Sequence, residues 1–377
     1  MRISKTNIRQ LSILFVLFVS AWLPDGYGQK AKQGHDAYYW TDIRDLGILG
    51  KGWKQDTLLY NRLPAKAEGM VRDPVWSLST HTAGFYVRFT SNATALRARW
   101  KLRYAQLSMN HFAATGVSGL DLYVKCKDGS WHWLGVGRPD SVANDVSLVL
   151  DMDEGTREYM LYLPLYNGVT SVQIGVEEGY FIRGVEAKNE KPIVVYGTSI
   201  IQGGCASRPG MCSTAILGRR LNREVINLGF SGNGRMEPEL AHLLAELDPL
   251  IYFLDCLPNL QPEEVKERVE PFVAILREAH PDTPIVLAEG VIYNNGFLVG
   301  PRRQKNAESC KALRTAYENL LADGYKNLYY QIAEGQLGLD GEGTVDGTHP
   351  TDLGFYHQAN AYQLTLENII SALSRED

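Results

Sequence analysis

Four short segments in the second half of the 377-residue chain carry groups that can take part in nucleophilic catalysis. The first is Gly197-Thr198-Ser199, which follows the apolar run Val194-Val195-Tyr196. A serine hydroxyl becomes a nucleophile when a base takes its proton and a rigid turn presents it to the substrate. Because serine caps many helices, the segment taken alone fits an N-cap better than a nucleophile. It is not a Gly-x-Ser-x-Gly turn, since position 201 is Ile.

A base for Ser199 is predicted in the last of these segments, Asp346-Gly347-Thr348-His349-Pro350. A carboxylate three residues before a histidine on a loop can orient the imidazole, which can then accept a serine proton. We therefore assign Ser199 as the candidate nucleophile, His349 as the candidate general base and Asp346 as the orienting carboxylate. The alternative for His349 is an ordinary histidine on a surface loop.

The other two segments can stabilise the negative oxygen that forms when a serine attacks a carbonyl. The loop Gly229-Phe230-Ser231-Gly232-Asn233-Gly234 follows an apolar run, and its backbone N–H groups can point at an oxyanion. Asn259 follows a second apolar run and can donate from its side-chain amide. Each segment by itself also fits a plain strand-to-helix turn or a helix cap. The N–H groups of this loop and the Asn259 amide are candidate oxyanion donors, and Asn233 is a candidate substrate-binding residue.

One sheet would bring these segments together. Apolar runs alternate with helical patterns from residue 191 to the C-terminus, which predicts a parallel sheet with helices on both faces. Ligands bind such sheets at the carboxyl ends of the strands, where Ser199, Gly232 and Asn259 are expected. The predicted strands are 193–196, 224–228, 250–254, 284–288 and 327–332, and the predicted helices are 211–221, 237–246, 262–279, 302–322 and 352–373.

Residues 30–187 show a different pattern and predict a separate domain. Short runs alternate apolar and polar residues, with Gly, Asp and Asn between them, which is typical of an antiparallel sandwich. A polar linker at 186–191 leads into the second domain, 191–377. His111 lies in a turn-like stretch that can reach the site, so it is a second candidate substrate-binding residue. The predicted strands are 85–90, 95–102, 120–125, 131–136, 158–163 and 171–176.

The N-terminus predicts export. Basic residues precede the apolar run 11–19, and Gly26-Tyr27-Gly28 places small residues at the positions that signal peptidase recognises. We expect a signal peptide over residues 1–28 and a periplasmic or extracellular protein without stable membrane insertion; an uncleaved anchor helix is the alternative. The net charge of -5, with no basic stripe, gives no reason to expect nucleic acid as a partner. The oligomeric state stays open.

The five cysteines do not form a disulfide scaffold. Cys205 and Cys212 flank a Pro-Gly turn and can either form a disulfide or remain buried thiols. The sequence contains no CxxC motif and no local Cys/His cluster, so no metal site is predicted.

The four segments resemble the conserved blocks of the SGNH (GDSL-type) hydrolases. The resemblance extends from about residue 191 to the C-terminus. Gly197-Thr198-Ser199-Ile200 is similar to their first block, although that block is usually Gly-Asp-Ser-Leu. Residues 227–232 resemble the second block, and Asp346 to Pro350 match the fifth closely. Asn259 falls where the third block has its Asn, within Asp-Cys-Leu-Pro-Asn in place of Gly-x-Asn-Asp. Residues 119–123, Gly-Leu-Asp-Leu-Tyr, resemble the GxDLY signature of a β-rich module that precedes one bacterial branch of the family.

The resemblance implies a flavodoxin-like doubly wound sheet preceded by a jelly-roll-like sandwich. It also implies a secreted serine esterase acting on O-acyl esters of carbohydrate, with O-acetyl esters the expected substrates and no cofactor or metal. Ser199, His349 and Asp346 would form the triad, and the oxyanion would be held by the N–H groups of Ser199 and Gly232 and by the Asn259 amide. The alternatives are a lipase or thioesterase on the same scaffold, or a glycan-binding protein without catalysis.

Overall fold

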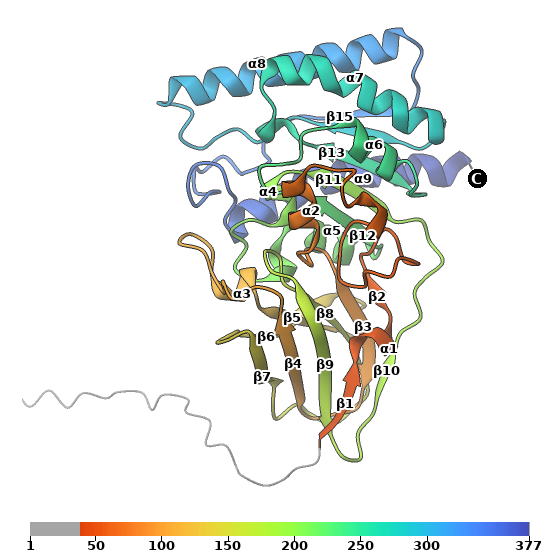
Figure 1. Ribbon diagram of the computed structural model, residues 1–377, viewed down its shortest axis with the longest axis vertical. Coiled ribbons are helices and arrows are strands. Elements are labelled where there is room, and N and C mark those ends of the chain that lie inside the picture. The colour runs from red at the N-terminus through yellow and green to blue at the C-terminus, as the bar shows by residue number, and fades with distance from the viewer. Residues whose placement is uncertain (1–37, 377) are drawn as a thin grey trace, which may run out of the picture. The chain divides into compact units, whose positions relative to one another are not determined.

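The computed structural model describes residues 38–376 (Figure 1). The predicted signal peptide, residues 1–28, lies outside the described residues. Within residues 38–376, no helix combines the length and the apolar character needed to cross a membrane.

Residues 38–184, which we call the N-terminal module, form two antiparallel sheets around a shared core. Alternate side chains such as Trp100, Ile174, Phe89 and Leu161 point inward from both sheets and are fully buried or nearly so. One sheet has the order β1 (Tyr38–Asp42), β9 (Val169–Glu177), β4 (Leu96–Leu102) and β7 (Ala143–Val149). The other has the order β10 (Ile182–Gly184), β3 (Tyr86–Ser91), β8 (Arg157–Tyr162), β5 (Leu120–Lys125) and β6 (Trp131–Gly137), with β2 (Ile48–Leu49) paired to β3.

The connections of the N-terminal module contain short helices. They are α1 (Ile43–Leu46), the 3-10 helix η1 (Ala65–Ala67), α2 (Asp73–Ser79) and α3 (Ala114–Val117). All six predicted strands are present to within one or two residues, whereas β1, β2, β7 and β10 were not predicted. In β7, Asn144 and Asp145 resemble turn residues, yet Leu148 is buried in the sandwich core.

Residues 193–376, which we call the α/β module, contain a five-stranded parallel sheet. Its order is β12 (Val225–Gly229), β11 (Ile193–Gly197), β13 (Ile251–Asp255), β14 (Ile285–Ala288) and β15 (Leu328–Gln331). This is the flavodoxin-like order, which confirms the predicted fold class. The strand order reverses next to β11, so the residues that follow β11 lie at the switch point where such folds bind ligands.

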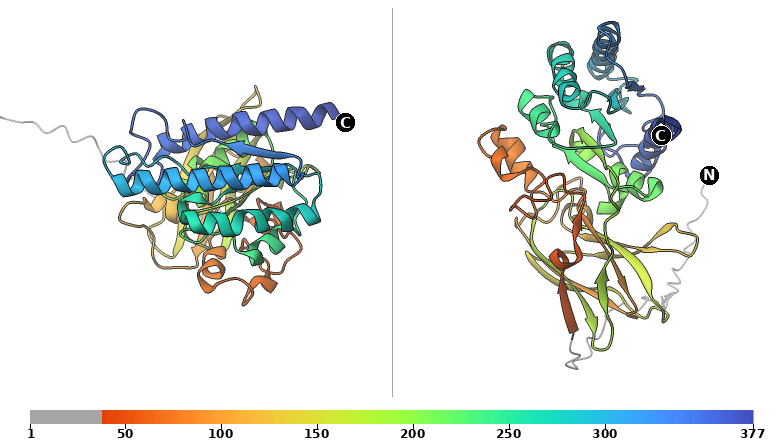
Figure 2. Two further views of the ribbon diagram at one scale, coloured as in Figure 1. Left: turned by 90° about the horizontal axis from the view of Figure 1, so that it is seen from above. Right: turned by 90° about the vertical axis from the view of Figure 1, so that its right-hand side faces the viewer.

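Helices cover both faces of the parallel sheet (Figures 1 and 2). Val194 and Tyr196 point to the face covered by α6 (Pro238–Leu244), α7 (Pro262–Ala279) and α8 (Gly300–Ala322). Ile193 and Val195 point to the face covered by α5 (Ser213–Leu221) and α9 (Asp352–Glu376). Burial of each such side chain stabilises the fold by roughly 1.5–3 kcal/mol. The remaining short helices are α4 (Ser199–Gln202), η2 (Pro209–Met211) and η3 (Leu257–Asn259).

The two modules share buried side chains rather than meeting only at a linker. Val71, just before α2, and Val75, on α2, join the core under α6. Tyr162 of β8 joins the core under α5. Asp121 of the Gly-Leu-Asp-Leu-Tyr segment is fully buried and accepts hydrogen bonds from Arg208 (3.0 Å) and the Gly210 N–H (2.8 Å). This motif therefore anchors the N-terminal module to the loop that precedes α5.

Candidate active site

Ser199 is the first residue of α4, directly after the tight turn that follows β11. Thr198 caps α4, and its Oγ1 accepts from the Ile200 N–H at 3.3 Å. The neighbouring strand end approaches so closely that a Cβ on Gly229 would lie 2.1 Å from the Gln202 nitrogen, so this position requires glycine. Ser199 is 7% exposed, whereas Thr198 and Ile200 on either side of it are fully buried.

The predicted base and carboxylate lie beside this serine. Ser199 Oγ is 2.9 Å from His349 Nε2, and His349 Nδ1 is 2.7 Å from Asp346 Oδ2. Asp346 Oδ1 also accepts from the backbone N–H groups of Thr348 (2.9 Å) and His349 (2.8 Å). Burial alone would raise the pKa of Asp346, but these hydrogen bonds and the imidazole lower that pKa to about 2. The carboxylate is thus ionised at neutral pH and fixes the His349 tautomer that leaves Nε2 free to accept a proton.

The predicted oxyanion residues also converge on Ser199. Gly232 has φ +69°, which favours glycine, and the space beside its Cα is open. Within residues 38–376, the N–H groups of Gly232 and Ser199 donate no backbone hydrogen bond. Asn259 sits at the end of η3, which supplies the bend after Asp255. In the amide orientation that satisfies its neighbours, its oxygen accepts from the N–H groups of Asn233 (3.1 Å) and Gly234 (3.2 Å). The Asn259 NH2 group is then available to an oxyanion.

A buried network that the sequence did not reveal holds the oxyanion loop in place. Gln202 Oε1 accepts from the Ser231 N–H (2.9 Å), and its Nε2 donates to His81 Nδ1 (3.1 Å). Burial, with the nearby charges of Arg62 and Arg103, lowers the pKa of His81 to about 3, so this imidazole is neutral.

Arg62 is the central residue of this network. Its guanidinium is buried and donates to the carbonyls of Gly229 (2.5 Å), Asn227 (3.3 Å), His81 (2.9 Å) and Leu78 (2.8 Å). Burial lowers the pKa of Arg62 to about 9, which keeps it charged at neutral pH. Arg62 therefore ties the end of β12 to the N-terminal module.

The N-terminal module also supplies one wall of the site. The Tyr166 hydroxyl donates to the Ser199 carbonyl at 3.1 Å. A cavity of about 470 Å³ opens between this tyrosine and the oxyanion loop, lined by apolar and uncharged polar groups. Its lining includes Leu78, His81, Tyr104, Met109, Tyr166, Ser231 and Asn233. Asn233, the candidate substrate-binding residue, lines this cavity, and its Oδ1 accepts from Arg72 at 2.8 Å.

His111 reaches the site as well, and it brings an unexpected cluster with it. Its ring packs edge-on against His349, with ring centroids 5.8 Å apart. The ligand atoms of His111, Cys205 and His349 all lie within 4.8 Å of one another. No local motif predicts this Cys/His cluster, because its three members come from segments far apart in the chain. All five cysteines are free, so Cys205 and Cys212 remain buried thiols and do not form a disulfide.

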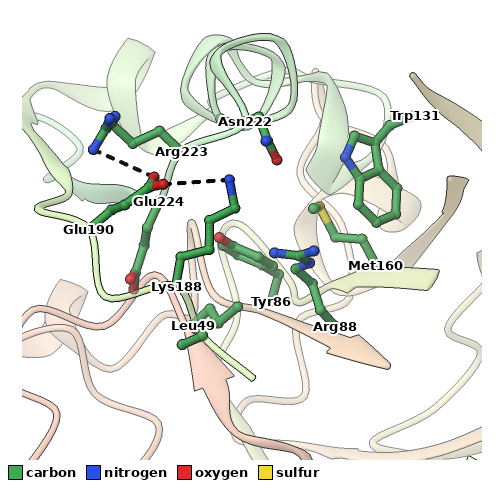
Figure 3. Close-up of a pocket in the computed structure, with 12 residues that line it drawn as sticks. Leu49, Tyr86, Arg88, Trp131, Met160, Lys188, Glu190, Asn222, Arg223 and Glu224 are labelled. Carbon is green, nitrogen blue, oxygen red and sulfur yellow. Dashed lines mark ion pairs between the residues drawn. The ribbon is translucent and has the colours of Figure 1, made fainter. Parts of the chain in front are cut away.

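A second, smaller pocket lies away from this site (Figure 3). It has a volume of about 40 Å³, and the linker and the start of β12 form one of its sides. The pocket therefore lies at the amino ends of the parallel strands, whereas Ser199 lies at their carboxyl ends. Glu190 lies between Lys188 (3.6 Å) and Arg223 (3.7 Å), so the charges around the pocket are paired. Its size and position exclude it as the site of the chemistry.

Two family models match the chain on either side of the predicted linker. A model of the GDSL-like lipase/acylhydrolase family matches residues 190–367. A second model, which describes the N-terminus of SGNH-hydrolase-type esterases and is named for the GxDLY motif, matches residues 38–182. Both agree with the resemblances seen in the sequence. No curated protein matches the chain by sequence.

Solved structures extend this comparison. A candidate GDSL-like lipase from Bacteroides ovatus is 37% identical, with a TM-score of 0.85 over 89% of this chain and 98% of that one. A salicylyl-acyltransferase from a tetracycline biosynthetic pathway is 18% identical, with a TM-score of 0.70 over 89% and 98% of the two chains. An acetyl xylan esterase from Butyrivibrio proteoclasticus is 12% identical, with a TM-score of 0.52 over 89% and 99%. At these low identities, the last two show the fold alone.

Proposed function

Because the chain belongs to the GDSL-like lipase/acylhydrolase family, we propose that it is a serine esterase whose nucleophile is Ser199. The observation that carries this proposal is the hydrogen-bond chain from Ser199 Oγ to His349 Nε2 and from His349 Nδ1 to Asp346. These three hydrogen-bonded residues lie next to the N–H groups of Ser199 and Gly232 and the Asn259 amide, which have the chemistry of an oxyanion hole. The family includes lipases and other acylhydrolases, so the reaction class is hydrolysis of an acyl ester.

The reaction would proceed through an acyl-enzyme. Ser199 Oγ attacks the ester carbonyl carbon while its proton passes to His349 Nε2. The carbonyl oxygen becomes negative and is stabilised by the N–H groups of Ser199 and Gly232 and by the Asn259 amide. The bond to the alcohol oxygen then breaks, and that oxygen takes the proton from His349. A water molecule gives a proton to His349 and attacks the acyl carbon, which releases the acid and returns the proton to Ser199.

We further propose that the substrate is an O-acylated carbohydrate, with acetyl as the acyl group. Likeness in fold to an acetyl xylan esterase supports this choice, as does the uncharged cavity of about 470 Å³ beside the oxyanion loop. Tyr104 in its wall can stack on a sugar ring, and Asn233 can hydrogen-bond sugar hydroxyls. Export through the predicted signal peptide would place the enzyme where polysaccharides are found.

The direct test is release of acetate from a panel of acetylated glycans by the purified protein, with Ser199→Ala as the control. We expect deacetylation by the parent and none above background by the variant. A steep preference for long-chain acyl esters would instead support a lipase. Glycan binding without any hydrolysis, by parent and variant alike, would contradict the esterase proposal.

A further inference from the structure

The cluster of His111, Cys205 and His349 has the composition of a transition-metal site. Two imidazoles and one thiol are ligands that zinc prefers, and zinc sites with three protein ligands keep a fourth position open. The three ligand atoms lie within 4.8 Å of one another, so small side-chain rotations can bring them around one ion. The residues come from the N-terminal module, from the loop after α4 and from the loop before α9, and the folded chain brings them together.

Both imidazoles have a hydrogen-bond partner at Nδ1, so Nε2 is the ring nitrogen that each can offer to a metal. His111 Nδ1 is 2.7 Å from the acceptor oxygen of Asn110, and His349 Nδ1 is 2.7 Å from Asp346. Each Nδ1 then donates in that hydrogen bond and Nε2 carries the lone pair, which in His349 accepts from the Ser199 hydroxyl (2.9 Å) and is released from that contact in Ser199→Ala. A hydrogen bond from the distal ring nitrogen to a carboxylate or carbonyl is the usual outer support of a metal-ligating histidine.

The backbone at Cys205 points to the same conclusion. Cys205 has φ +77°, a left-handed conformation that costs energy for any residue except glycine. It follows Gly203 and Gly204 in the loop after α4, where another glycine would remove this strain. The strained position nevertheless carries a thiol, and that thiol faces the two histidines.

We propose that His111, Cys205 and His349 form an inhibitory site for Zn²⁺ or a similar soft divalent ion. On binding, the Cys205 thiol gives its proton to solvent and its sulfur joins the two Nε2 atoms as a ligand. The Nε2 lone pair of His349 is the one that would accept the Ser199 proton, so a bound ion and a working base exclude each other. The inhibitory effect rests on the proposed function, whereas the binding itself does not.

Binding is measured first on Ser199→Ala, which makes the result independent of esterase activity. We expect one Zn²⁺ per chain by calorimetry, and Co²⁺ is expected to give the near-ultraviolet charge-transfer band of a thiolate ligand. Loss of an outer-shell partner alone lowers metal affinity by about 10–100-fold. Adding Cys205→Ala or His111→Ala should therefore lower the affinity at least that much, while Cys126→Ala in the same background should leave it unchanged.

Inhibition is then measured on the otherwise unaltered enzyme with p-nitrophenyl acetate. Zn²⁺ should abolish hydrolysis, a chelator should restore it, and Cys205→Ala should stay active at zinc concentrations that silence the Cys126→Ala control. The proposal is overturned if Ser199→Ala shows no cobalt–thiolate band, if Cys126→Ala weakens binding as much as Cys205→Ala, or if zinc accelerates hydrolysis. Zinc binding by a protein that hydrolyses no ester would refute the proposed function and leave the metal site standing.

Discussion

Asp346 acts at two points of the loop that carries His349. One oxygen faces the imidazole, and the other accepts two backbone N–H groups. Asp346→Asn can keep the backbone contacts, but it removes the negative charge that stabilises the imidazolium. We expect kcat/KM for p-nitrophenyl acetate to fall by about 10²–10⁴-fold with an unchanged circular dichroism spectrum. A fall of less than a few-fold would show that this carboxylate does not serve the base.

Asn259 is the oxyanion candidate that the sequence placed with the least support, because its segment departs from the family pattern. The 3-10 helix after Asp255 brings its amide onto the oxyanion loop. Asn259→Asp keeps the shape and replaces the NH2 donor by a carboxylate oxygen. We expect kcat to fall by at least about 10²–10³-fold, with a small change in KM. Steady-state kinetics of Asn259→Asp beside Asn259→Ala checks this, and an active Asn259→Asp would exclude the amide from the oxyanion hole.

The functional residues that the sequence predicted and those that it did not predict differ in how far along the chain their partners lie. Ser199, Gly232, Asn259, Asp346 and His349 each sit in a short pattern next to a strand end or the last helix, so local spacing reveals them. Arg62, Tyr166 and Cys205 act through contacts with segments remote in the chain. Nothing within a few residues of them indicates those contacts, and only the folded chain shows them.

At the scale of elements, the N-terminal module helps to hold the oxyanion loop. Arg62 reaches the carbonyls at the end of β12, just before Gly232. Arg62→Lys keeps the charge but cannot reproduce the planar fork that serves four carbonyls. We expect kcat to fall by about 10–10²-fold because the oxyanion donors shift, together with a lower melting temperature. Arg183→Lys, at an exposed position on β10, is the control and should behave as the parent does. Equal kinetics for the two variants would contradict this role.

The elements themselves were predictable where burial is strong and the pattern long. The limits of α7 coincide with the prediction, 262–279, because it begins with Pro262 and has acidic residues in its first turn. The parallel strands are fully buried and appear as continuous apolar runs. The missed elements are short or lie at sheet edges, such as β1 and β10, or they depend on the junction, as α2 does.

At the scale of the whole molecule, one buried acid sets a pH dependence of stability. Burial raises the pKa of Asp255 to about 7, although Tyr362 donates to it at 2.8 Å and thereby lowers that pKa in part. An aspartate in an unfolded chain has a pKa of about 3.9. The folded protein therefore holds a proton that the unfolded chain releases, so this group's stabilisation is complete below pH of about 4 and is lost as pH rises through about 7.

Asp255→Asn mimics the protonated acid at every pH and tests this effect. The quantity to follow is the free energy of unfolding of the variant minus that of the parent. This difference should be larger at pH 8 than at pH 5, by on the order of a few kcal/mol. Denaturant unfolding of both proteins at the two pH values measures this. If the difference in free energy of unfolding between variant and parent does not change with pH, Asp255 is ionised in the folded protein.

The central claim is that Ser199 is a nucleophile activated by His349, and active-site labelling tests it most directly. The protein is incubated with a fluorophosphonate, and the adduct is located by peptide mass spectrometry. The account predicts one adduct per chain, on Ser199, with no labelling of Ser199→Ala and greatly slowed labelling of His349→Ala. An adduct on another residue, or hydrolysis of p-nitrophenyl acetate by Ser199→Ala at the parent rate, would contradict it.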